Sequence, residues 1–151
     1  MESNGCAWAN HLHLITLVDL SMESDQTLFA RMGGRPAIDG LVIDFYRRAH
    51  QHPILGPVFT AHVTDWPSHL ATVADFWSTQ TGGPRLYRGG MGRHIRLGLR
   101  PEHFLEWLTL WESTVRSRFP EEIALDLMVI AKVIAGRLQE MVDGVEQLRV
   151  G

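Results

Sequence analysis

The chain has 151 residues, enough for one domain with a hydrophobic core, and 45% of them are apolar, which argues against a disordered protein. Its 14 basic and 17 acidic residues give a formal charge of -3, too small an excess to indicate a nucleic-acid or membrane partner. Cys6 is the single cysteine, so an internal disulfide, a cysteine-based zinc site and an iron–sulfur cluster within one chain are excluded.

No apolar run is long enough to span a bilayer. The first residues lack a basic stretch, and His11 and His13 interrupt their apolar part, which is not typical of a signal peptide. We therefore expect a cytoplasmic protein. Residues 1–21 show weak periodicity and are expected to be an N-terminal extension, either a mobile tail or the result of a start placed too early. Residues 22–151 are expected to form the domain.

The domain is predicted to begin with two helices. Ser24 or Asp25 can cap a short helix that ends at Gly33. The second helix begins near Pro36 and ends at His52, which precedes a proline. The apolar residues of the second helix follow the i, i+3, i+4, i+7 spacing of one helix face: Ile38, Leu41, Val42, Phe45, Tyr46 and Ala49.

A compact corner rich in proline and glycine is predicted over residues 53–59. Asp65 can cap a third helix that ends at Gly82. The following segment, 85–100, is rich in glycine and arginine and has too little apolar spacing for a long helix. At most one helical turn is expected there, around Met91–Ile95.

Pro101 opens a fourth helix and Pro120 a fifth, each with acidic residues in its first turn. The sequence has no strand pair with hairpin chemistry and no internal repeat. Several helices with connections of mixed length are typical of a helical fold more complex than an up-and-down bundle. The pattern thus predicts an all-α domain.

Four side chains are candidates for chemistry. His94 follows the glycine-rich stretch Gly89–Gly92, where an imidazole can approach a metal without steric hindrance, although a surface histidine in a flexible loop is the alternative. Tyr46 lies on an apolar stripe, where its hydroxyl can donate to a ligand in a pocket or bond to a core carbonyl. His69 and Trp107 also lie on apolar stripes, and both could equally be core residues.

Other groups of residues are weaker candidates for a functional site. The pairs His11–His13 and His50–His52 could each offer two nitrogens to zinc, but neither has a carboxylate or thiolate at a recognised ligand spacing. We interpret both pairs as solvated histidines. Motifs of the GxSxG, Walker A, HExxH and GxGxxG types do not occur in the sequence.

The order of these residues resembles that of the truncated haemoglobins. Ile43–Tyr46, followed by His52–Phe59, resembles the second helix and the following corner of that family. Trp66–His69, together with Phe76–Trp77, resembles the distal helix of its group III branch.

The second half of the chain continues this resemblance. His94–Leu97 is similar to the proximal segment of the group III branch. Pro101–Phe104 and Trp107–Glu112 are similar to the helix that follows it. The resemblance is collinear and covers roughly residues 25–145.

The resemblance implies a truncated globin-like two-over-two helical sandwich around haem b, with His94 as the proximal ligand of a five-coordinate iron. Tyr46, His69 and Trp107 would be the polar residues of the distal side. Phe59 would pack on the haem face, and Trp77 would line the distal side. Residues at the haem propionates would be Tyr87 and Arg93, with Arg85 or Arg88 as substitutes.

The implied function is reversible binding of dioxygen or another diatomic gas, such as nitric oxide or carbon monoxide, by a carrier, store or sensor. The same residues would also serve a haem enzyme, either a nitric oxide dioxygenase or a peroxidase-like protein, which would need a reductase partner. A third interpretation is a helical interaction domain without haem.

Overall fold

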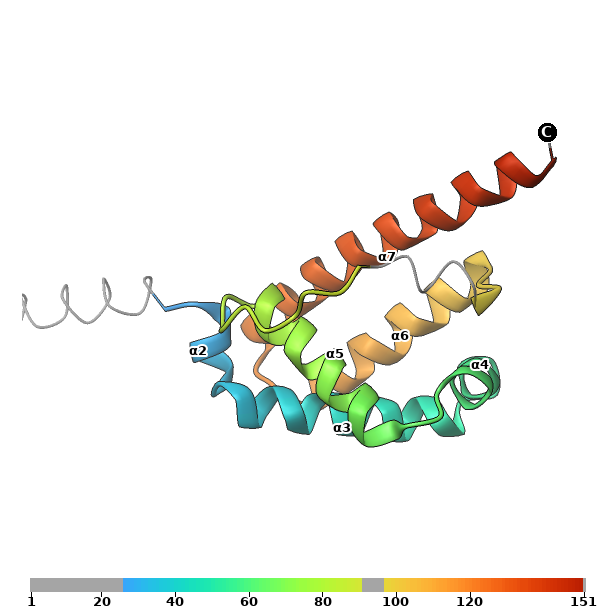
Figure 1. The fold of residues 1–151 in the computed structure, drawn as a ribbon. Coiled ribbons are helices and arrows are strands. Elements are labelled where there is room, and N and C mark those ends of the chain that lie inside the picture. The colour runs from blue at the N-terminus through green and yellow to red at the C-terminus, as the bar shows by residue number, and fades with distance from the viewer. Residues whose placement is uncertain (1–25, 91–96, 151) are drawn as a thin grey trace, which may run out of the picture.

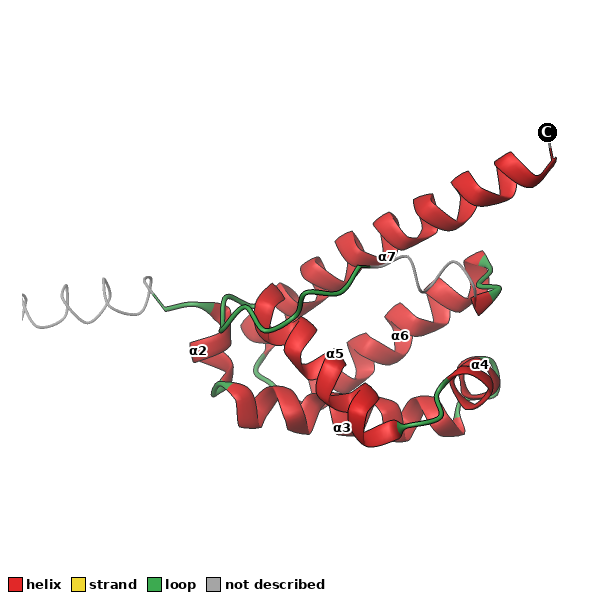
Figure 2. Cartoon of the chain, viewed as in Figure 1, coloured by secondary structure: helices red, strands yellow, loops and turns green. Residues whose placement is uncertain are grey.

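The computed structural model describes residues 26–90 and 97–150, and within these ranges the chain forms six α-helices and no strand (Figures 1 and 2). The helices in chain order are α2 (Leu28–Met32), α3 (Arg35–Gln51), α4 (Leu55–His62), α5 (Trp66–Gln80), α6 (Pro101–Arg118) and α7 (Glu121–Val150). The prediction of an all-α domain is confirmed.

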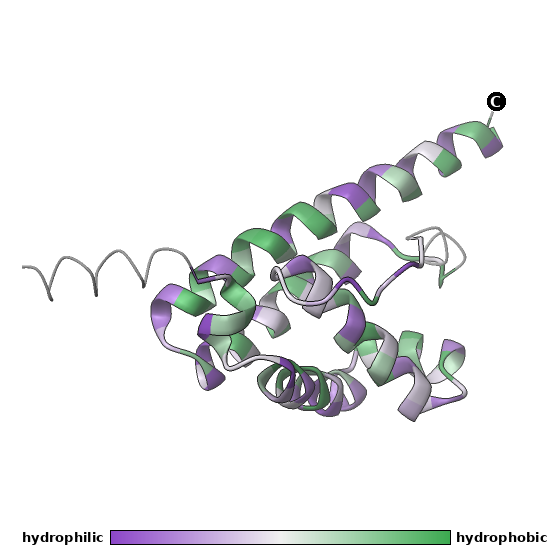
Figure 3. Ribbon diagram, turned by 60° about the vertical axis from the view of Figure 1, so that its left-hand side comes forward, coloured by the Kyte–Doolittle hydropathy of each residue, from purple (hydrophilic) through white to green (hydrophobic). Residues whose placement is uncertain are grey.

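Two helix pairs make up the body of the domain. Helix α3 packs on α5, α6 packs on α7, and α3 also packs against α6 and so joins the two pairs. The C-terminal end of α7 extends past the other helices (Figure 1). Apolar and polar residues alternate along α7 in Figure 3, as expected for a helix with one face toward the core.

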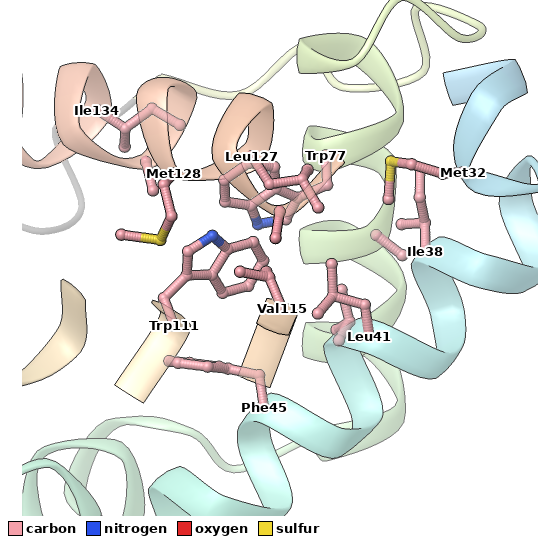
Figure 4. Close-up of a cluster of buried hydrophobic side chains, with 14 of the residues drawn as sticks. Met32, Ile38, Leu41, Phe45, Trp77, Trp111, Val115, Leu127, Met128 and Ile134 are labelled. Carbon is pink, nitrogen blue, oxygen red and sulfur yellow. The ribbon is translucent and has the colours of Figure 1, made fainter. Parts of the chain in front are cut away.

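The core lies where the apolar faces of both pairs meet (Figure 4). The predicted stripe of α3 is buried, with Ile38 and Leu41 at 0% exposure and Phe45 at 1%. Trp111 of α6 and Leu127 of α7 meet this stripe from the other pair. Burying an apolar side chain of this size contributes about 1.5–3 kcal/mol, so this shared core is what holds the pairs together.

The cap of α2 differs from the prediction. Thr27 caps this helix, because its Oγ1 accepts a hydrogen bond of 3.2 Å from the backbone N–H of Ala30. The predicted caps, Ser24 and Asp25, lie outside the described residues. Gly33 ends the helix at a φ of 108°, a left-handed conformation that glycine adopts without strain.

The predicted corner over residues 53–59 is wrong in one respect, because most of it belongs to helix α4. The Nδ1 atom of His52 accepts hydrogen bonds of 3.2 Å from the backbone N–H groups of Ile54 and Leu55 at the start of this helix. Pro57 lies in the first turn, where a missing N–H leaves no helical hydrogen bond unmade. Proline therefore stands at the start of a helix here.

The remaining boundaries follow the prediction. Asp65 caps α5, with its Oδ1 accepting a hydrogen bond of 3.1 Å from the backbone N–H of Ser68. Residues 84–90 form no helix, whereas the turn expected around Met91–Ile95 lies outside the described residues. Pro101 is the first residue of α6. None of the helices in the described ranges is long and apolar enough to cross a membrane.

Candidate functional site

A cavity of about 350 Å³ lies between α3, α4, α5, α6 and α7. Its volume is within the range of about 300–1,000 Å³ that is usual for small-molecule and cofactor sites. Most of its walls are apolar, and the side chains that form them include Val42, Phe45, Val73, Phe76, Phe104, Ile134 and Leu138. The polar or hydrogen-bonding side chains that line it are Tyr46, His62, His69, Thr72, Tyr87, His103, Trp107 and Trp111.

Tyr46 connects three helices at one wall of the cavity. Its ring meets Phe59 of α4 edge to face, with centroids 5.2 Å apart. On the α5 side, its ring centroid lies 5.1 Å from that of His69 and 5.7 Å from that of Trp66. Burial raises the pKa of the Tyr46 hydroxyl well above its ordinary value of 10.0, so this group stays protonated and can donate.

Trp107 approaches the same cavity from α6. Its indole lies nearly parallel to that of Trp111, with centroids 5.8 Å apart, and meets Phe45 edge to face at 6.2 Å. Three predicted donors, Tyr46, His69 and Trp107, therefore come from α3, α5 and α6 and line one cavity.

The predicted cofactor contacts line this cavity as well. Phe59 packs on Tyr46, and Trp77, which is 3% exposed, stacks on Trp111 with ring centroids 4.3 Å apart. Tyr87 meets Phe76 edge to face at 5.1 Å and lies on the segment that follows α5. All the predicted site residues that the structure describes are thus brought together.

Two predicted residues, Arg93 and His94, lie outside the described residues. The described residues on either side of that segment, Gly90 and Leu97, both line the cavity. Within residues 26–90 and 97–150, no group of three or more His, Cys, Asp or Glu side chains could hold a metal ion. A haem iron needs only one or two protein ligands, since the porphyrin supplies the other four.

A sequence model of the bacterial-like globin family matches residues 27–135 of the chain. The chain belongs to this family.

Individual globins show the same relationship. The group 3 truncated hemoglobin ctb of Campylobacter jejuni is 29% identical over 103 residues, which cover 64% of this chain and 81% of that protein. The crystal structure of the group III truncated hemoglobin from Campylobacter jejuni superposes with a TM-score of 0.67 and 29% identity, over 72% of this chain and 91% of the other.

The group II truncated hemoglobin from Bacillus anthracis also superposes with a TM-score of 0.67, at 25% identity, over 75% of this chain and 90% of the other. These likenesses confirm the predicted resemblance to truncated haemoglobins and the two-over-two fold. Membership of the globin family supports a haem-binding protein.

Besides Trp111, sequence reasoning missed three polar side chains of this globin's cavity. Thr72 lies one helical turn after His69, so the spacing of α5 was the signal that could have found it. His62 lies at the end of α4, beyond the predicted corner, in a stretch to which the sequence pattern assigned no helix. His103 lies in the first turn of α6, and its Nδ1 accepts a hydrogen bond of 2.9 Å from the backbone N–H of Arg100.

The donor set of the cavity fits a haem. Wide apolar walls suit the flat faces of a porphyrin, and the hydrogen-bond donors that line the cavity suit a polar ligand on its iron. Arg85 and Arg88 are exposed on the segment that carries Tyr87, where cations can meet the carboxylates at the edge of the porphyrin.

Proposed function

We propose that this globin binds haem b in the cavity, with His94 as the iron ligand, and reversibly binds dioxygen or another diatomic gas. The observation that carries this proposal is the position of Tyr46, His69 and Trp107, which reach one apolar cavity from three different helices. When bound, haem supplies an iron centre that can take a diatomic gas and shift electron density toward it.

The residues of the chain would act on that shifted charge. The Tyr46 hydroxyl is kept protonated by burial, and the Trp107 indole N–H can only donate, so both groups favour a ligand with negative character. A hydrogen bond to a charged acceptor contributes about 1.5–3 kcal/mol. Because about 1.4 kcal/mol is a factor of ten in affinity, two such bonds slow ligand release by orders of magnitude.

Other residues would hold the cofactor. Phe59 would pack on the haem face, and Trp77 would close the distal side. Tyr87 and Arg93 would lie at the propionates, with Arg85 or Arg88 able to replace Arg93. Apolar walls around these groups exclude water, which strengthens the hydrogen bonds that remain inside.

A second candidate function is that of a haem enzyme, either a nitric oxide dioxygenase or a peroxidase-like protein. The observation that favours it is the number of donors in the cavity, because several donors retain bound oxygen more tightly than easy release requires. Such an enzyme would also need a reductase to return the iron to its ferrous state after each turnover.

The test is to titrate the purified full chain with haemin and record its visible absorption spectrum. We expect one haem per chain, a five-coordinate ferrous spectrum, and reversible complexes with dioxygen and carbon monoxide. A chain that does not bind haem would instead be a helical interaction domain. Consumption of nitric oxide by the oxygen complex over repeated cycles with a reductase would favour the enzyme over the carrier, store or sensor.

A further inference from the structure

Three tryptophan side chains that line the cavity stack on one another. The indole of Trp111 lies 4.3 Å from that of Trp77, with 15° between the ring planes, and 5.8 Å from that of Trp107, with 9° between the planes. Figure 4 shows Trp77 of α5 above Trp111 of α6 in the core. The stack begins at the half-buried Trp107 and continues to two indoles that are 2% and 3% exposed.

This parallel arrangement is confined to tryptophan in the part of the chain that the structure describes. Every other aromatic pair there meets edge to face, with interplanar angles between 65° and 89°. Edge-to-face and offset-parallel contacts are both usual ways for aromatic rings to pack in a core. The rings of Trp77 and Trp111 are nearly parallel with centroids 4.3 Å apart, close enough for their π systems to overlap. Indole is among the most easily oxidised side chains, so the stack is suited to electron transfer.

The indole nitrogen of Trp111 adds a second observation. Its Nε1–H is buried and donates no hydrogen bond within residues 26–90 and 97–150. Buried donors without a partner are uncommon, and an indole N–H cannot act as an acceptor. An oxidised indole normally loses this proton to a neighbouring base. Among the described residues Trp111 has no hydrogen-bonded base, so no side chain in that part of the chain is placed to take the indole proton on oxidation.

We propose that Trp107, Trp111 and Trp77 form an electron relay that supplies one electron when a hydroperoxide is reduced in the cavity. The relay rests on the proposed function, since bound haem is needed to reduce the peroxide.

With hydrogen peroxide, the O–O bond breaks as two electrons and two solvent protons convert it to two water molecules. One of the two electrons would come from the bound haem and the other from the relay, which would leave one indole as a radical cation. Two molecules of a one-electron reductant, such as ascorbate, then restore both centres.

A path of ring contacts connects the relay to solvent. Trp77 meets Phe76 edge to face at 5.7 Å, and Phe76 meets Tyr87 edge to face at 5.1 Å. Tyr87 is partly exposed and donates a hydrogen bond of 3.4 Å to the carbonyl oxygen of Gly90. A reductant in solution can therefore meet an oxidisable ring without entering the cavity.

The experiment uses the haem-loaded full chain in its ferric form, mixed with one equivalent of hydrogen peroxide. Freeze-quenched samples are measured by electron paramagnetic resonance, and the products are mapped by peptide mass spectrometry. The relay predicts an indole radical cation and oxidation of the buried Trp111 and Trp77 ahead of Trp66, which is more exposed than either. An oxidant that diffuses through solvent would modify the tryptophans in order of exposure, so the two patterns are opposite.

Substitutions test whether the radical signal depends on the three stacked tryptophans. Trp111→Phe should lower the radical signal by about tenfold, the effect of a barrier higher by about 1.4 kcal/mol, while retaining the haem spectrum. Trp77→Phe serves as a second variant if Trp111→Phe does not fold. Trp66→Phe is the matched control, because this indole contacts Tyr46 and His69 but lies outside the stack.

The outcomes separate the relay from the proposed function. Failure to bind haem would contradict the proposed function and the relay together. Haem-loaded protein that oxidises Trp66 first, or a Trp111→Phe variant with an undiminished radical signal, would overturn the relay and leave gas binding untouched. Radical loss in both stack variants but not in Trp66→Phe would support it.

Discussion

The phenol ring of Tyr46, from α3, meets the imidazole ring of His69, from α5, edge to face with centroids 5.1 Å apart. Helix α3 supplies one of these rings and α5 the other, and both rings line the same cavity. Their contact therefore depends on how α3 and α5 pack, and it couples the environment of the Tyr46 hydroxyl to the stability of the fold.

The first prediction follows from the raised pKa of Tyr46. Above pH 10, the unfolded chain loses the phenolic proton while the folded chain keeps it, so the free energy of unfolding falls as pH rises. The slope for one proton is about 1.4 kcal/mol per pH unit, and this stability is fully present below pH 10. Urea unfolding between pH 9 and about 11.5 should show this decrease in the wild type and lose it in Tyr46→Phe.

Tyr87→Phe is the control for that measurement, because it removes the other of the two tyrosines, and its hydroxyl bonds only to the exposed Gly90 carbonyl. We expect it to retain the wild-type dependence on pH. An equal loss of the slope in both variants would show that the Tyr46 hydroxyl is not the group responsible.

The second prediction concerns the close approach of Gly56 to the end of α3. A β-carbon at position 56 would lie 2.7 Å from the carbonyl oxygen of His50, a backbone atom that cannot move aside. Gly56→Ala should lower the free energy of unfolding by about 1–3 kcal/mol, as overpacking does. Gly136→Ala is the matched control in α7, where nothing lies within 4 Å, and it should raise stability by about 0.4–1 kcal/mol. Urea midpoints of the two variants that change in the same direction would contradict this account.

Much of the fold could be predicted because long helices repeat their apolar spacing many times. The stripes of α3, α5, α6 and α7 were visible in the sequence, and Asp65 acts as the cap of α5 that its position predicted. Short elements carry too few repeats for such a pattern. The signals at α4 were ambiguous, because proline and glycine mark both a turn and the first turn of a helix.

The candidate site was only partly accessible to sequence reasoning. Periodicity showed that Tyr46, His69 and Trp107 each lie on an apolar face, but it says nothing about which faces of different helices meet. The collinear resemblance to the truncated haemoglobins was what indicated that these three faces meet around one cavity. The stack of Trp77 on Trp111 depends on the rotation of α5 against α6, and no pattern in one helix encodes that angle.

The third prediction is that residues 1–21 are dispensable. Thr27 caps α2 with its own side chain, and the family match begins at the same residue, so the first described helix needs no contact from earlier residues. A chain that begins at Met22 should bind haem with the same spectrum and melt at a similar temperature. A large loss of thermal stability would show that the segment packs on the core.

The fourth prediction assigns the iron to His94. His94→Ala should retain haem poorly or change its spectrum, and added imidazole should restore the original spectrum by occupying the vacant coordination position. His62→Ala is the control, because His62 lines the same cavity but its Nδ1 lies 2.8 Å from the Val58 carbonyl oxygen, to which it can donate. An unchanged spectrum in His94→Ala would exclude this histidine as the ligand.

The fifth prediction concerns how bound oxygen is held. Tyr46→Phe and Trp107→Phe should each speed oxygen dissociation, measured by stopped-flow replacement with carbon monoxide. Carbon monoxide carries less negative charge when bound, so its own dissociation should change less. Because both side chains would donate to one ligand, the effects in the double variant should not add. Thr72→Val, a nearly isosteric change at the cavity wall, should leave the oxygen rate unchanged.

His69→Leu separates two roles for the imidazole that meets Tyr46. If His69 donates a hydrogen bond to the ligand, its loss should speed the dissociation of oxygen but hardly that of carbon monoxide. The reason is that bound oxygen carries more negative charge and is stabilised more by a donor. If His69 instead obstructs the path into the cavity, its loss should speed association of oxygen and carbon monoxide alike. When none of the three substitutions changes the oxygen off-rate by more than a factor of about two, or roughly 0.4 kcal/mol, these donors do not hold the ligand. The haem-enzyme alternative would then lose its main support, because it depends on the same donors.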